Sequence, residues 1–239
     1  MVGLPALLLV SSLAAPSVSA RVWPQVRLEV PLHPRLGLQL DASARTVLWP
    51  APAWDRTVDT VSLGGKLGAG FQLSLGTGWV ARRTERSLLD VTELRVFEQA
   101  SWASTVGALQ LAARARLEHR AVVGGALLHR VRVQAKAGVV TPQAVGVYGL
   151  LESFVQVHDA GTAHAGLEQQ RFQVGVELPL ARGLSVDLAF LERWVTGLNA
   201  PAEWQQVVLM TLVVQVPAPG RTLAPVQGSQ PLPRADEAR

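Results

Sequence analysis

The sequence predicts an all-β fold: a single closed antiparallel transmembrane β-barrel of about 10–12 strands, with a polar lumen and an apolar outer band. Three observations predict it. Polar and apolar residues alternate with a period of two, the alternating segments are long, and short connections alternate with longer ones. A globular strand has about five or six residues, whereas a tilted strand of about 9 to 11 residues crosses a membrane.

Residues 1–20 are interpreted as a signal peptide. They carry no charged side chain, hold an apolar run over 4–10, and end in small residues that predict cleavage after Ala20. A retained helical anchor is the alternative. The chain has no cysteine, which excludes disulfides and thiolate metal sites. We therefore expect export to the outer membrane of a Gram-negative envelope.

The barrel domain is predicted over 21–216. Its candidate strands, in chain order, are 22–30, 36–49, 58–68, 70–83, 91–103, 108–121, 126–139, 145–157, 167–179, 184–195 and 204–216. We interpret the first as a short strand that does not span, because bacterial single-chain barrels usually have an even number of strands. Ten spanning strands follow from this, with twelve as the alternative. The Pro-rich segment 217–239 is predicted to be a disordered tail.

The strand at 126–139 shows the alternation most clearly. Arg130, Arg132, Gln134 and Lys136 alternate there with valine and alanine. The strand before it follows the same rule with Arg114, Arg116, Glu118 and Arg120, and the strands at 167–179 and 184–195 keep one apolar face almost to the end of the chain. These strands predict one charged face and one apolar face.

The connections and tryptophans fit a barrel that spans a membrane. Tight turns are expected at 31–35, 67–70, 104–107, 141–144 and 180–183, and looser loops at 50–57, 83–90, 158–166 and 196–203. Six tryptophans near predicted strand ends are expected to form an interfacial girdle: Trp23, Trp49, Trp79, Trp102, Trp194 and Trp204. A soluble periplasmic β-sandwich with tryptophans at its sheet ends is the alternative architecture.

Four segments resemble a known family when taken in order: ELRVFEQ at 93–99, ARARLEHR at 113–120, LLESFV at 150–155 and LEQQRFQVGVEL at 167–178. Together they resemble the bacterial family catalogued as domain of unknown function 2490, over about residues 22–216. The resemblance implies an outer-membrane β-barrel and assigns no catalytic residue. The matching positions are Glu93, Arg95, Gln99, Arg114, Arg116, Glu118, Arg120, Glu152, Phe154, Gln170 and Arg171.

Most of these charged residues fall on the polar face of their strands, which is the lumen of a barrel, because an arginine facing lipid at the midplane costs roughly 2–4 kcal/mol. The predicted lumen charge network is Glu93, Arg95, Gln99, Arg114, Arg116, Glu118, Arg120, Arg130, Arg132, Glu152 and Arg171. Arginine and lysine exceed glutamate on these strands, so a lumen that conducts should prefer anions.

Three functions remain open. The first is a structural or envelope-interaction barrel with a plugged lumen, the second a small porin-like pore for anionic solutes, and the third a lipid-modifying enzyme. We expect no enzyme, because neither a His-x-Ser pair nor a serine flanked by glycines occurs. No cofactor, metal or nucleic acid is expected. The expected partners are outer-membrane lipid, the barrel-assembly machinery and, for a pore, small anionic solutes.

Overall fold

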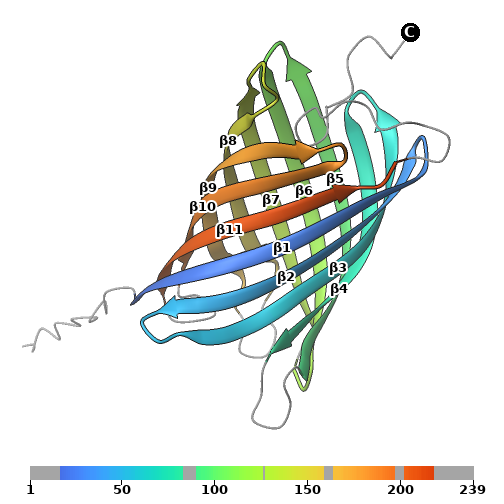
Figure 1. Ribbon diagram of the computed structural model, residues 1–239. Coiled ribbons are helices and arrows are strands. Elements are labelled where there is room, and N and C mark those ends of the chain that lie inside the picture. Colours follow the sequence, from blue (N-terminus) through green and yellow to red (C-terminus); the bar gives the residue numbers. More distant parts are fainter. Residues whose placement is uncertain (1–16, 83–89, 126, 159–163, 197–201, 218–239) are drawn as a thin grey trace, which may run out of the picture.

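Eleven β-strands make up almost all of the structure, a computed structural model that describes residues 17–82, 90–125, 127–158, 164–196 and 202–217. No helix occurs in these ranges, so none is available to cross a membrane. The strands are β1 (Ser17–His33), β2 (Leu36–Trp49), β3 (Ala53–Gly68), β4 (Phe71–Arg82), β5 (Asp90–Val106), β6 (Leu109–Val122), β7 (Leu127–Val140), β8 (Gly146–Gln156), β9 (Gly166–Ala181), β10 (Leu184–Val195) and β11 (Glu203–Gln215) (Figure 1).

The strands close into a barrel. Each strand pairs antiparallel with the next along the chain, and β1 pairs with β11 to complete the ring. Every strand thus has two hydrogen-bonded neighbours, and the sheet has no free edge. The predicted all-β closed barrel is confirmed, and the alternative of a β-sandwich is excluded.

The prediction for the first strand was wrong. It was expected to be short and not to span, yet β1 has 17 residues and pairs with β11 from Ser17 to Glu29. Because this pairing is parallel, the barrel closes with an odd number of strands, eleven, where ten or twelve were expected. The parity argument failed because it assumed that every pair is antiparallel.

The predicted start of the mature chain also falls within β1. Cleavage after Ala20 would remove the first four residues of the strand, including Ser19, whose hydroxyl donates to Glu203 of β11 at 2.6 Å. Residues 1–16 and 218–239, which hold most of the predicted signal peptide and tail, lie outside the described residues.

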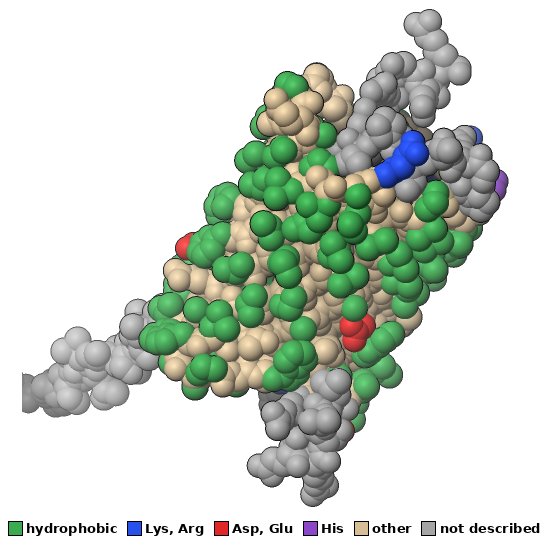
Figure 2. Space-filling view, in the orientation of Figure 1, with side chains coloured by type: hydrophobic (Ala, Val, Ile, Leu, Met, Phe, Trp, Pro, Cys, Tyr) green, Lys and Arg blue, Asp and Glu red, His purple; other side chains and the backbone are tan. Residues whose placement is uncertain are grey.

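Alternation along the strands separates an interior face from an outer face. On β4, Leu73 and Leu75 point outward and are more than half exposed, while Gln72 and Ser74, which alternate with them, point inward. Seen from the side of β1–β4 and β9–β11, the outer face is mostly apolar, with isolated charged groups (Figure 2). The apolar outer band predicted from the sequence is therefore present.

The two ends of the barrel differ. Tight turns join β1 to β2, β3 to β4, β5 to β6, β7 to β8 and β9 to β10 at one end, which we call the turn rim; β11 also ends there. At the other end, the loop rim, β1 begins, and residues 50–52, 83–89, 123–126, 157–165 and 196–202 connect the strands that end there to the next ones. Gly70, at φ +80° in the turn between β3 and β4, has no room for a side chain, because a Cβ would lie 1.9 Å from the carbonyl oxygen of Ala103.

Two glycines make room for large interior rings. Gly76 on β4 is paired with Phe97 on β5, and Gly175 on β9 is paired with Tyr148 on β8. A Cβ on Gly76 would lie 2.2 Å from Cζ of Phe97, and one on Gly175 would lie 2.6 Å from Cζ of Tyr148. Both rings therefore lie against backbone that carries no side chain, and both are buried.

Candidate functional site: the charged barrel interior

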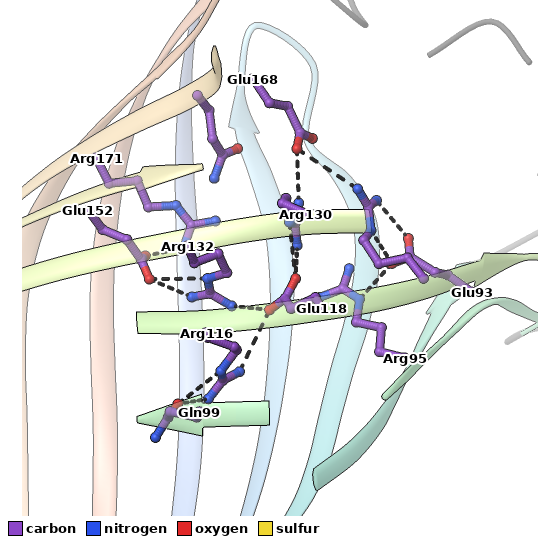
Figure 3. A network of polar contacts seen from close by, with 12 residues as sticks. Glu93, Arg95, Gln99, Arg116, Glu118, Arg130, Arg132, Glu152, Glu168 and Arg171 are labelled. Atoms are coloured by element: carbon purple, nitrogen blue, oxygen red, sulfur yellow. Dashed lines mark hydrogen bonds and ion pairs between the residues drawn. The ribbon is translucent and has the colours of Figure 1, made fainter. Parts of the chain in front are cut away.

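The structure places all eleven residues of the predicted lumen charge network on the interior face of five neighbouring strands, β5 to β9. Cross-strand pairing brings the positions together: Glu118 is paired with Arg130, and Glu152 with Arg171. With Glu168, which the sequence did not indicate, they form one connected set that we call the central network (Figure 3). Its members are Glu93, Arg95, Gln99, Arg114, Arg116, Glu118, Arg120, Arg130, Arg132, Glu152, Glu168 and Arg171.

Glu118 is the most buried carboxylate of the network, with 1% of its surface exposed. It accepts hydrogen bonds from Nε of Arg130 at 3.0 Å and from a terminal nitrogen of Arg132 at 2.7 Å. Arg116 lies 3.7 Å from Oε1, the oxygen that Arg132 also binds. Three guanidinium groups thus surround one carboxylate, an arrangement that compensates its burial only while all of them stay in place.

Glu152 repeats this arrangement two strands further on, on β8. It accepts hydrogen bonds from Arg132 and Arg114 at 2.7 Å each and from Arg171 at 3.4 Å. Arg132 donates to both Glu118 and Glu152 and so joins the two clusters.

Toward the loop rim, Glu93 and Glu168 extend the network. Glu93 accepts hydrogen bonds from Arg95 at 2.6 Å and from Arg120 at 2.7 and 3.0 Å. Glu168 accepts one from Arg130 at 3.2 Å and lies 3.9 Å from Arg120. Shared arginines connect the whole set, most of which is labelled in Figure 3.

Aromatic rings stabilise several of the buried arginines through cation–π contacts. Seven arginines face four glutamates in the central network, an excess of three positive charges. The Cζ atoms of Arg132, Arg171 and Arg130 lie 4.6, 4.4 and 5.1 Å from the ring centre of Phe154, and that of Arg116 lies 3.9 Å from the ring centre of Phe97. Both phenylalanines are at most 2% exposed, so these cation–π contacts are desolvated.

Apolar side chains fill the interior beside the network. Trp23, Leu191 and Val207, from β1, β10 and β11, form a buried cluster, and Val58 and Val80 add buried side chains from β3 and β4. Together with the network, these residues come from strands all around the barrel. At this level the interior is packed across its width.

The prediction that Trp23 belongs to the interfacial girdle was wrong. It was expected at a membrane interface but lies inside the barrel, 4% exposed, with the guanidinium of Arg45 at 4.3 Å and that of Arg171 at 5.4 Å from its ring. The alternation contained the signal, since Trp23 stands two residues from Arg21 and from Gln25 on the polar face of β1. Trp49, Trp79 and Trp204 are exposed, each at least 38%.

Sequence reasoning also missed interior charges on the other strands. Glu168 was missed because a bulge shifts the start of β9: Phe154 is paired with Gln169, but Val155 is paired with Leu167. On the opposite wall, Arg21 lies 3.0 Å from Asp55 and 3.1 Å from Glu203, and Arg27 lies 2.7 Å from Asp41. The wall opposite the central network thus holds ion pairs of its own.

Toward the turn rim the interior opens into a cavity of about 770 Å³, which we call the cup. Gln99, Arg114 and Arg116 of the central network line its inner end. His33, Lys66 and Gln215 line it at the strand ends of the turn rim. The barrel interior therefore has two parts, a packed part toward the loop rim and a polar cavity toward the turn rim.

One polar cluster interrupts the apolar outer face. Nε2 of His119 lies 3.2 Å from a carboxylate oxygen of Glu98, and its Nδ1 lies 2.6 Å from Nδ1 of His129, whose ring is in turn 4.8 Å from that of His158. Within the described ranges, no group of three or more histidine, cysteine, aspartate or glutamate side chains has the geometry to hold a metal ion. The cluster is thus a polar patch over β5, β6 and β7.

A family model described as "Protein of unknown function (DUF2490)" matches residues 20–203. The chain belongs to this family. The match begins within β1, ends where β11 begins, and includes every residue of the central network, so the network is part of the DUF2490 domain. Searches of curated proteins and of solved structures gave no match. The resemblance inferred from the four segments is confirmed, and the family description assigns no role to the interior charges.

Proposed function

We propose that this DUF2490 protein is an outer-membrane β-barrel with a closed lumen, which acts in envelope structure or interaction and not in transport. The closed sheet, the mostly apolar outer face and strands of 11 to 17 residues support a membrane location, because each strand is long enough to cross a bilayer when tilted. The apolar N-terminal segment supports export. Its lipid partner is then the outer membrane, and the barrel-assembly machinery inserts it.

The observation that carries the closed lumen is the burial of the central network. Glu118, Glu152 and Arg130 are between 1% and 6% exposed in the middle of the barrel, and Phe97 and Phe154 are packed against the arginines. A continuous path for water and ions would expose these groups. We also assign no catalytic activity, because Glu118, Glu152 and Arg130 of the central network are engaged in ion pairs within it.

A small anion-preferring pore is the second candidate, and the cup favours it. The cup is an open cavity in part of the barrel interior. Its charged lining consists of five cations and one carboxylate: Arg27, Lys66, Arg114, Arg116, Lys136 and Glu29. If thermal motion opened the packed part, an anion would meet mostly positive side chains.

Conductance of the refolded full chain in a planar bilayer separates the two candidates. We expect no steady current from a barrel whose folding is verified by its shifted mobility on an unheated gel. The pore would instead give a steady anion-selective current that Arg116→Glu shifts toward cations. Recovery of the protein with detergent-extracted outer membranes, and not with the soluble fraction, tests the location.

A further inference from the structure

We propose that the cup is a binding site for a small polyhydroxylated molecule that carries two or more phosphate or carboxylate groups. The proposal deepens the proposed function, since it rests on a closed lumen that gives the cup an inner end. A volume of about 770 Å³ is in the range of small-molecule sites.

The charge of the cup points to an anion. Five cationic side chains line it and one carboxylate does, and four of the cations have acidic partners that do not line the cup: Asp41 for Arg27, Glu118 for Arg116, Glu152 for Arg114 and Glu177 for Lys136. The cations of these four pairs line the cavity, whereas the carboxylates do not. The cavity therefore faces the positive ends of these pairs.

Donor groups on the cup remain available to a ligand. The Arg114 side chain is 24% exposed; one of its two terminal nitrogens donates to Glu152, and the other has no hydrogen-bond partner among the described residues. Lys66 at the turn rim has no ion pair among the same residues and is exposed. One donor at the inner end and one at the mouth can each meet a separate anionic group.

The remaining wall suits hydroxyl groups. Five glutamines and three serines line the cup, among them Gln39, Gln72 and Ser74. Amide and hydroxyl side chains both donate and accept hydrogen bonds, as sugar and polyol hydroxyls do. The cations come from β1, β3, β6 and β7, on different sides of the cavity, which favours a ligand with more than one charged group.

Titration calorimetry on the full chain in detergent tests the site, with glucose 1,6-bisphosphate, glucarate and glucose as probes. We expect saturable binding of at least one of the two anions, weakened by added salt, and none of glucose. The first anion tests phosphate recognition and the second carboxylate recognition. Absence of saturable binding by both would overturn the proposal.

Two variants with the same change of charge locate the site. Lys66→Glu places a carboxylate at the mouth of the cup, and we expect it to weaken binding by about tenfold. Arg182→Glu changes an exposed residue of the β9–β10 turn that does not line the cup, and we expect less than about a twofold effect. Equally weakened anion binding in both variants would show that the anion is attracted to the charge of the rim in general, and would overturn the proposal. The conductance measurement is separate, so a silent barrel that binds neither anion would refute the site and leave the closed lumen.

Discussion

At the scale of single residues, the interior depends on carboxylates that each serve several arginines. Glu118 contacts Arg116, Arg130 and Arg132, and Glu152 contacts Arg114, Arg132 and Arg171. Removing one arginine leaves such a carboxylate with two partners. Removing the carboxylate leaves several buried cations facing one another, which is the more costly change.

Glu118→Gln should therefore lower the free energy of unfolding by about 3 to 5 kcal/mol, because it keeps the shape of the side chain and removes the charge that Arg130 and Arg132 need. Urea unfolding in lipid vesicles measures this. Arg182→Gln, at an exposed position in the β9–β10 turn, is the control and should change stability by less than about 1 kcal/mol. Comparable losses in both variants would show that burial of the network contributes little.

Gly76 offers a second test at this scale. Gly76→Ala places a Cβ where the ring of Phe97 and the carbonyl oxygen of Val61 lie, at 2.2 and 2.7 Å, and should cost about 1 to 3 kcal/mol. Gly65→Ala is a matched control on neighbouring β3, since a Cβ there meets nothing within 4 Å. The same unfolding assay compares the two variants. An unchanged free energy of unfolding for Gly76→Ala would mean that the Phe97 ring does not need the space left by the missing side chain at Gly76.

Residues of the central network could be predicted because alternation is a local property of the sequence. Glu168 and Trp23 show its limits. A single bulge places Glu168 on the interior face, although strict alternation would place it outside. Trp23 was assigned to the interface because tryptophan generally prefers interfaces, although its position in the alternation of β1 indicates the interior. The cup could not be predicted, because its volume depends on which side chains fill the interior at each level of the closed ring.

At the scale of elements, the strands were predicted more accurately than their closure. From the second strand on, every predicted strand corresponds to an observed one; β2 and β10 match at both ends, and the start of β3 differs most. The first strand was shortened by the expected cleavage site and by the parity rule. Pairing between the first and last strands depends on long-range closure of the barrel, which no local pattern reports.

The parallel joint between β1 and β11 can be tested by cross-linking, because the chain has no cysteine of its own. Val22 is paired with Val208. Cysteines at these two positions should form a disulfide under mild oxidation, seen as a mobility shift on a denaturing gel that a reductant reverses. A pair at Val22 and Leu212, four residues out of register, should not. Cross-linking of the second pair alone would contradict the register.

At the scale of the whole molecule, two properties coexist in one sheet. The outer face is mostly apolar, whereas the interior is charged and packed toward the loop rim and open toward the turn rim. Period-two alternation made this division predictable. The interior is divided into a packed part and a cup because the rings of Phe97 and Phe154 and the ion pairs of the central network lie toward the loop rim. Whether the packed part stays closed decides whether the protein is a closed barrel or a pore.

The odd number of strands has a consequence for biogenesis. Since β1 begins at the loop rim and β11 ends at the turn rim, the two ends of the barrel sequence leave on opposite sides (Figure 1). A barrel built only of hairpins can insert them one after another, with both chain ends staying behind. Here β1 has no hairpin partner at the loop rim, so in a bilayer the start of β1 must cross by itself, and reporter tags placed at the two ends of the barrel would be reached from different compartments.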